Sequence, residues 1–204
     1  PGVMGEWSYM FCLFGLPSIN QPWGWQLFGH HLTLNCLFID RQMVLTPTFM
    51  GAEPTFADDG PFKGIHAFQD EERVGLELMR SFSPQQQATA LIASSMVGGD
   101  LPDGRRHLAD GLHLGGAHQD NRIIPYEGLI GAELTLPQRR DLIGLIQEFI
   151  CTLPPGPLEA RMTNIDRHLD ETHFCWIGSR EERKPFYYRI QSPVILIEFD
   201  HHAG

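Results

Sequence analysis

The residues best suited to chemistry lie in two short polar clusters near opposite ends of the 204-residue chain. His30-His31 precedes a strand-like segment, and the run Glu-Phe-Asp-His-His occupies residues 198–202. Side chains in a strand alternate between faces, with neighbours on one face roughly 6.5 to 7 Å apart. Glu198, Asp200 and His202 are therefore expected to share one face. Such a row offers the imidazole and carboxylate donors that transition metals bind.

Six residues of these clusters are candidate metal ligands: His30, His31, Glu198, Asp200, His201 and His202. His31 is the leading candidate, because alternation places it on the polar, solvent-facing side of its segment with Thr33 and Asn35. His30 is expected on the apolar side, where a core histidine that donates to a backbone carbonyl is the competing interpretation. His201 is expected on the opposite face of the last strand from the acidic row.

Two histidines and one carboxylate are typical of non-haem iron or zinc centres with open coordination positions for water and substrate. A metal held in this way lowers the pKa of bound water or presents iron to dioxygen. The sequence lacks the helical His-Glu-x-x-His pattern, and residue types alone do not identify the metal. The competing interpretation is a hydrogen-bonded surface histidine at position 31 and an exposed polar strand end at residues 198–202.

Four further residues are candidate catalytic groups: Glu53, Tyr126, Glu127 and Arg189. Glu53 lies between a Gly-Ala pair and a proline, and is either a general base or supporting carboxylate at the site or a simple turn residue. Tyr126 and Glu127 fall in a long glycine-dense segment, where they either close over a pocket or anchor the loop. Arg189 lies in a predicted strand, where it either binds a substrate carboxylate or pairs with an acidic neighbour.

The composition restricts the class of partner. A hydrophobic content of 42% is enough for a single large core. The net charge of -10 argues against nucleic-acid and anionic-membrane surfaces, because phosphate binding needs clustered Lys and Arg. No apolar run reaches the roughly 18 to 20 residues needed to cross a bilayer. We therefore expect a soluble protein that binds a small molecule or another protein, with its location undecided and the cytoplasm favoured.

Several common site motifs are absent from the sequence. There is no Gly-x-Ser-x-Gly elbow, no P-loop and no Gly-x-Gly-x-x-Gly fingerprint, so the corresponding hydrolase, nucleotide and dinucleotide sites lack their motifs. The cysteines form no Cys-x-x-Cys pair, and we expect them to be buried reduced thiols: Cys12, Cys36, Cys151 and Cys175.

The elements that must position these residues follow the order strands, helices, strands. Period-two alternation predicts early strands at residues 7–14, 30–39 and 43–50. A hairpin turn is expected at residues 40–42, and Pro47 weakens the following strand or places it at a sheet edge. Three more strands are predicted at residues 173–177, 186–190 and 194–200.

Four helices are predicted between these strands, at residues 70–82, 83–96, 135–150 and 157–169. Capping boxes mark two of their starts, with Ser83 and Gln86 in one and Thr135 and Gln138 in the other. Asp70 is the expected N-cap of the first helix.

The segment from residue 98 to residue 131 has no sustained period, is dense in glycine, and contains His107, His113 and His118. A loop of this length inside a compact domain is usually functional or mobile. The order of elements predicts a single α+β domain over residues 1–204, with a mainly antiparallel sheet and helices packed on one side. The missing initiator Met and the end directly after the His-rich strand suggest truncation at both ends.

Four segments together resemble one known family. They are the Trp-Gly-Trp at residues 23–25, FGHHLTLNCLFIDRQMVLTPTFMGAEP at 28–54, QDNRIIPYEG at 119–128 and PFYYRIQSPVILIEFDHH at 185–202. This pattern is similar to the domain-of-unknown-function 3500 family, and within it to the fungal-type members. His118 departs from the aromatic residue expected there in fungal-type members.

The resemblance implies no established activity. It implies that full-length members carry a helical region before this segment, and a His-x-His and an Asp-Tyr-Gly stretch after it. Some ligands of a metal site would then lie outside this chain.

The leading hypothesis from the sequence is a metal-dependent enzyme acting on a small organic molecule, with oxidoreductase and hydrolase chemistry both open. The alternatives are a non-catalytic small-molecule-binding module with structural histidines and a structural protein, so enzymatic activity itself is undecided. The leading hypothesis requires His31 to lie within about 5 Å of the Glu198 or His202 side chain, as ligands of one metal do.

Overall fold

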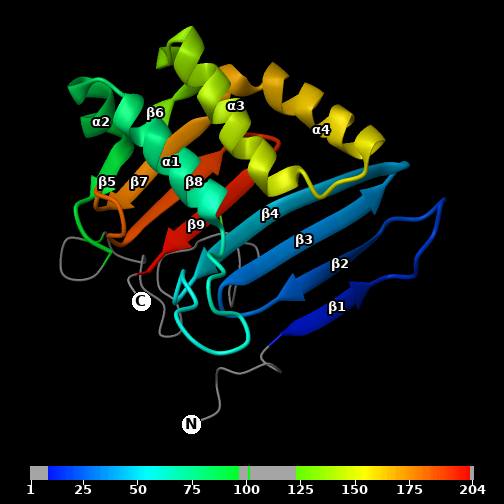
Figure 1. Cartoon of the computed structure of the whole chain (residues 1–204). Coiled ribbons are helices and arrows are strands. Elements are labelled where there is room, and N and C mark those ends of the chain that lie inside the picture. The colour runs from blue at the N-terminus through cyan, green and yellow to red at the C-terminus, as the bar shows by residue number, and fades with distance from the viewer. Residues whose placement is uncertain (1–8, 97–100, 102–122, 203–204) are drawn as a thin grey trace.

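Nine strands form one sheet, and the helices cover one of its faces (Figure 1). The structure is a computed structural model that describes residues 9–96, 101 and 123–202. The strands are β1 (Met10–Phe14), β2 (Trp23–Phe28), β3 (Leu32–Ile39), β4 (Gln42–Ala52), β5 (Leu91–Ala93), β6 (Leu129–Ile130), β7 (His173–Gly178), β8 (Phe186–Gln191) and β9 (Leu196–His201). The helices are α1 (Gln69–Ser81), α2 (Pro84–Ala90), α3 (Leu136–Ile150) and α4 (Pro155–Arg167), with short 3-10 turns η1 (Gly131–Glu133) and η2 (Leu169–Glu171).

The sheet joins two antiparallel meanders through one parallel pair. Its order is β1-β2-β3-β4-β9-β8-β7-β5, with β6 also paired to β7. The β4–β9 and β5–β7 pairs are parallel, and the other pairs are antiparallel. The predicted α+β fold, with a mainly antiparallel sheet and helices on one side, is confirmed. The β4–β9 pair matters for function, because it places the last strand beside the end of β4.

The main core lies between the helices and the C-terminal half of the sheet. Parallel and tilted aromatic rings from β7, β8 and β9 line this face, with Trp176 and Tyr188 centroids 5.9 Å apart and Tyr188 and Phe199 centroids 5.1 Å apart. Phe149 of α3 meets Tyr188 edge-on at 6.2 Å. Each such pair adds about 0.5 to 1.5 kcal/mol beyond the area that it buries. This aromatic packing therefore keeps the strands of the candidate site in fixed register.

Both predicted capping boxes are confirmed. The hydroxyls of Ser83 and Thr135 accept hydrogen bonds from the backbone N–H groups of Gln86 and Gln138, and the glutamine side chains accept from the caps in return. The prediction that α2 runs to residue 96 is wrong, because the helix ends at Ala90. The chain then pairs in parallel with β7, and this tertiary pairing overrides the local helical pattern.

Other boundaries differ from the prediction for local reasons. Strand β2 was not predicted, because the turn signals before it masked a short aromatic alternation. The N-cap of α1 is Phe68 in a left-handed conformation, and Asp70 lies inside the first turn. Pro47 does not mark an edge, since β4 lies inside the sheet and Pro47 coincides with a register shift opposite Asn35, whose amide donates to its carbonyl at 2.8 Å.

Two predictions fall wholly or partly outside the described residues. The segment with His107, His113 and His118 is not described, and neither are residues 7 and 8 of the first predicted strand. The expectation of four buried thiols holds for Cys36 and Cys175 but not for Cys151, which is exposed, or for Cys12, which is half-buried. Among the described residues, the helices are too short or too polar to cross a lipid bilayer.

Candidate metal centre

The sheet register places residues from distant parts of the chain in one row. Gly51 of β4 lies opposite Asp200 of β9, and Asp200 lies opposite Tyr187 of β8. His31, just before β3, accepts a hydrogen bond through its backbone carbonyl from the Gly51 N–H at 2.9 Å. These four residues therefore lie in one row across the sheet. The Tyr187 side chain belongs to a small cluster separate from the helix-covered core, so the row occupies the face away from the helices.

His31, Asp200 and His202 converge on that face. Nδ1 of His31 lies 3.4 Å from Oδ1 of Asp200, and Nε2 of His202 lies 3.0 Å from Oδ2 of the same carboxylate. The two imidazole centroids are 5.4 Å apart. Each residue offers one donor atom, and these three atoms lie within 4.8 Å of one another. The spatial relationship that the metal hypothesis requires is therefore present, while the role of these residues as ligands stays a prediction.

The Asp200 carboxylate is buried, with only 1% of its surface exposed. Burial alone would raise its pKa, but hydrogen bonding and positive charge from His202 and His31 hold the pKa of Asp200 below its ordinary value. Gly51 provides the space for this side chain, because a Cβ at that position would lie 1.7 Å from Oδ1 of Asp200. An ionised carboxylate between two imidazoles is a ready donor for a divalent cation.

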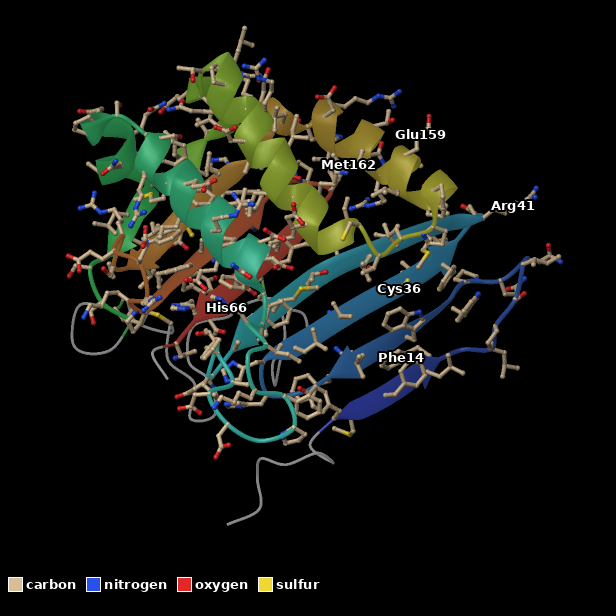
Figure 2. The ribbon with its side chains drawn as sticks, in the orientation of Figure 1. Phe14, Cys36, Arg41, His66, Glu159 and Met162 are labelled. Carbon is tan, nitrogen blue, oxygen red and sulfur yellow. The ribbon has the colours of Figure 1, made fainter. Side chains whose placement is uncertain are left out.

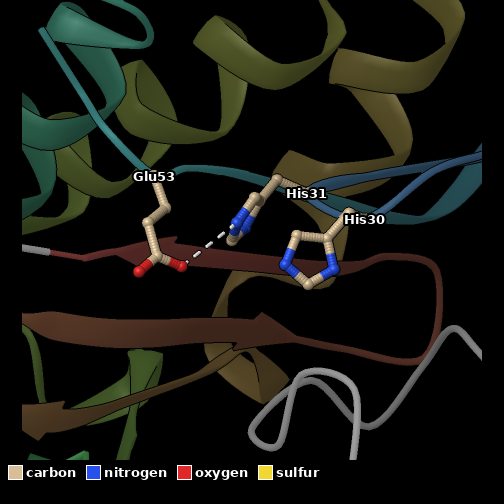
Figure 3. Close-up of side chains that lie close together, drawn as sticks. All are labelled: His30, His31 and Glu53. Carbon is tan, nitrogen blue, oxygen red and sulfur yellow. Dashed lines mark ion pairs between the residues drawn. The ribbon is translucent and has the colours of Figure 1, made fainter. Parts of the chain in front are cut away.

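A second set of donors overlaps the first at His31. His30, His31 and Glu53 also offer three donor atoms within 4.8 Å of one another, as Figure 3 shows for their side chains. Nε2 of His31 lies 3.7 Å from Oε2 of Glu53, and the His30 and His31 rings meet edge-on at 4.2 Å. Half of the Glu53 side chain is exposed and His30 is partly exposed, so this set faces solvent while Asp200 lies beneath.

Glu198 lies one row further along the same face and has a different partner. It accepts a hydrogen bond from the Tyr187 hydroxyl at 2.5 Å and lies opposite Arg189 in the β8–β9 register. Arg189 donates to Glu127 at 2.7 Å and to the Pro125 carbonyl at 2.9 Å. Burial alone would lower the pKa of Arg189, but its acidic neighbours, Glu198 and Glu127 among them, raise it. Of the two interpretations of Arg189, the geometry favours pairing with an acidic neighbour.

His201 faces the helices, as alternation predicts. Its Nδ1 lies 3.2 Å from the Lys184 carbonyl, its Nε2 lies 3.5 Å from Oε2 of Glu72, and its ring stacks on Phe186 at 5.1 Å. Glu72 also meets His66 at 2.9 Å. This arrangement separates His201 from the Asp200 side of the sheet, and it gives Glu72, in the first turn of α1, two histidine partners.

Tyr126, the last of the predicted site residues, lies apart from both donor sets. Tyr126 is half-exposed and its ring lies 5.1 Å from that of His173, and neither residue belongs to the two donor sets. Thr33 was expected on a solvent-facing side, but only 1% of it is exposed, and Phe28 and Phe49 flank it in the adjacent strands. Gly51 was missed as a site residue. The signal for it was its place two residues before Glu53, near the end of a strand.

Comparison with known proteins identifies the family. A family model described as "Protein of unknown function (DUF3500)" matches residues 2–204. The chain belongs to the DUF3500 family. Searches of curated proteins and of solved structures found no match. The resemblance noted from the sequence is thereby confirmed for the family, whose description names no activity.

Proposed function

We propose that this DUF3500 chain binds a divalent transition metal between His31, Asp200 and His202, and uses it as an enzyme on a small organic substrate. The observation that carries the proposal is the convergence of three donor atoms within 4.8 Å. The donors come from segments far apart in the chain, which the parallel β4–β9 pair holds side by side. Their placement is therefore a property of the sheet rather than of a loop.

The chemistry of the donor set supports this function. Two imidazoles and one carboxylate satisfy half of an octahedral shell and leave positions for water and substrate. Such a metal, when bound, lowers the pKa of coordinated water or activates dioxygen, so zinc would support hydrolysis and iron would support oxidation. Glu53 is the proposed general base, because its Oε2 lies 3.7 Å from Nε2 of His31, the ring nitrogen other than the one beside Asp200.

The buried carboxylate supports a ligand at this position. In the described residues, Oδ1 of Asp200 makes no hydrogen bond of standard geometry, although Nδ1 of His31 lies 3.4 Å away. Buried polar atoms usually have a close bonding partner. A cation shared by the carboxylate and the two imidazoles would give Oδ1 of Asp200 such a partner. Because the imidazoles must bind in their neutral form, metal affinity is expected to fall at acidic pH.

One observation favours the alternative of a non-catalytic small-molecule-binding module with structural histidines. The hydrogen bond between His202 and Oδ2 of Asp200, at 3.0 Å, satisfies one oxygen of the carboxylate without a metal. In that case the two histidines stabilise the strand ends, and their loss costs stability with or without metal. The two functions therefore differ in whether a metal changes the stability of the protein.

The deciding experiment is metal analysis of the purified full-length protein, wild type and variants, after loading with Zn²⁺, Fe²⁺ or Co²⁺. We expect one metal per chain in the wild type and at least a tenfold loss of affinity in His31→Ala and His202→Ala. Co²⁺ adds absorption bands that report the ligand geometry. His168→Ala is the matched control, because His168 pairs with Glu171 on the surface and should leave binding unchanged.

Two further variants separate the overlapping donor sets. Loss of metal in Asp200→Asn with retention in His30→Ala and Glu53→Gln supports the buried set, and the reverse pattern supports the exposed one. Failure of the wild type to hold any stoichiometric metal would overturn the proposal. Thermal unfolding with and without metal then distinguishes the structural alternative, which predicts no metal-dependent shift.

A further inference from the structure

A groove on the helix-covered face contains a buried arginine. The groove has a volume of about 1180 Å³ and lies between α4 and the ends of β2, β3 and β4 that are remote from the donor sets. Figure 2 shows Arg41 at the β3–β4 turn, close to the helix that carries Glu159 and Met162. Because the donor sets lie on the other face of the sheet, this groove is separate from the proposed metal centre.

Arg161 of α4 lines the groove and is 5% exposed. One hydrogen bond restrains it, from Nη2 to the Val194 carbonyl at 2.6 Å. In the part of the chain that the structure describes, its Nε has no hydrogen-bond partner and no carboxylate lies within ion-pair distance. Burial lowers the pKa of Arg161, with no acidic neighbour to offset it. An arginine nevertheless stays protonated at neutral pH, so the groove wall carries an uncompensated positive charge.

The sheet side of the groove is flat and aromatic. The rings of Trp23 and Phe38 stack with their centroids 4.1 Å apart and their planes within 5° of parallel. The indole N–H of Trp23 donates to the Ser18 carbonyl at 3.0 Å, which fixes the ring against rotation. Both rings are partly exposed, and Met43 continues the apolar lining. Such a wall favours the flat face of a ring or another planar apolar group.

We infer that this groove binds a small organic carboxylate with a flat apolar body. The carboxylate accepts hydrogen bonds from the Nη groups of Arg161, where the Val194 carbonyl leaves donors over, and the body lies against Trp23 and Phe38. A guanidinium matches a carboxylate with two parallel N–H···O bonds, and such charge-assisted bonds are roughly twice as strong as neutral ones. The other charged residues of the groove are Asp40 and Arg41 at the hairpin, whose charges are opposite. The charge of Arg161 is therefore left to complement one anionic group.

The overall charge favours a monoanion over a phosphate ester. The chain has a formal net charge of -10, and a polyanion would be repelled by that field with one buried arginine to hold it. A single carboxylate on an apolar frame loses less to this repulsion and gains from the aromatic wall. The inference stands independently of the metal centre, since no residue is shared.

The test compares phenylacetate with phenylacetamide on the wild-type protein, by calorimetry and by tryptophan fluorescence. The two probes have the same ring and differ in charge. We expect saturable binding of phenylacetate at millimolar concentration and at least tenfold weaker binding of the amide. Equal affinities, or no saturable binding of phenylacetate, would overturn the inference, and this comparison needs no mutation.

Variants of Arg161 then test whether the carboxylate binds at this residue. Arg161→Met is expected to weaken phenylacetate binding at least tenfold and to leave the weak binding of the amide unchanged, while Arg161→Lys should retain part of the affinity. Arg140→Met is the matched control, because Arg140 is an exposed arginine on α3 outside the groove. An equal loss in Arg140→Met would show that the effect is general electrostatics and would contradict a site at Arg161.

Discussion

Gly51 and Asp200 face each other across the parallel β4–β9 pair, and the missing side chain of one makes the space for the carboxylate of the other. A Cβ at position 51 would lie 1.7 Å from Oδ1, 2.8 Å from Cγ and 3.0 Å from the backbone carbonyl oxygen of Asp200. Glycine is thus required at position 51, because Asp200 lies too close for any side chain there. The Asp200 carboxylate can point toward His31 only because position 51 carries no side chain.

Gly51→Ala is therefore expected to displace Asp200 and to weaken metal binding. Overpacking of this kind costs about 1 to 3 kcal/mol of unfolding free energy, which chemical denaturation would measure. Gly144→Ala is the control, since Gly144 lies in α3 and a new Cβ there would meet no heavy atom within 4 Å apart from its chain neighbours and the local helix backbone. That change should stabilise the protein by about 0.5 to 1 kcal/mol, because alanine is the better helix former. A Gly51→Ala variant with an unchanged free energy of unfolding and normal metal binding would contradict this account.

The buried ion pair between Arg189 and Glu127 is expected to matter more than surface pairs. The arginine is 1% exposed and the N···O distance is 2.7 Å. Glu127→Gln removes the charge that compensates a buried cation, so we expect a loss of about 1.5 to 3 kcal/mol in urea unfolding. Glu171→Gln breaks an exposed pair with His168 and should change stability by less than about 1 kcal/mol. Equal effects of the two variants would show that Arg189 is compensated by its other neighbours.

Thiol reactivity should separate the cysteines by burial. Desolvation raises the pKa of Cys36 from 9.0 to about 11, which lowers its thiolate fraction near pH 8 by about a hundredfold. Cys175 is fully buried and Cys151 is exposed. A thiol-specific reagent should therefore modify Cys151 rapidly, and Cys36 and Cys175 only after denaturation. Cys151→Ser should remove the fast phase and leave the slower labelling of the half-buried Cys12, and rapid labelling of Cys36 in the folded protein would contradict its burial.

The features that the sequence predicted correctly are local ones. Alternation along residues 198–202 separates Asp200 from His201, because the period of two follows directly from strand geometry. The Ser83 and Thr135 capping boxes depend on residues three apart, and both are present. His31 was chosen from its neighbours in one strand, and the expectation that it meets the polar face of the last strand agrees with the 5.4 Å between the His31 and His202 rings, although β4 lies between β3 and β9 in the sheet.

The features that the sequence did not predict depend on distant segments. The parallel β4–β9 pair has no local signal, so neither the opposition of Gly51 to Asp200 nor the central position of Pro47 could be obtained from the pattern. Glu198 was grouped with Asp200 by alternation, but its partner is the Tyr187 hydroxyl on the neighbouring strand. The buried charge of Arg161 was also invisible, because its burial comes from the packing of α4 against the sheet.

Glu71 provides a test of the pH dependence of stability. Burial raises its pKa above the ordinary value of 4.5, and the charges of Glu148 and Asp70 act in the same direction, against a smaller opposing effect of a backbone hydrogen bond. A carboxyl whose pKa is higher in the folded state binds its proton more tightly there. Its contribution to stability is therefore fully present below pH 4.5 and is lost as the pH rises through the folded-state pKa.

Glu71→Gln should remove this pH dependence. The variant is expected to be more stable than the wild type at pH 7, where the wild type carries a disfavoured charge, and the difference should shrink as the pH falls below 4.5. Urea denaturation from pH 3.5 to pH 7.5 would measure it. Glu77→Gln is the control, since Glu77 is exposed in the same helix and pairs with Arg73, so its loss should give no gain at neutral pH. A Glu71→Gln variant less stable than the wild type at pH 7 would show that the helix dipole outweighs desolvation at this position, because negative charge in the first turn of α1 is otherwise favourable.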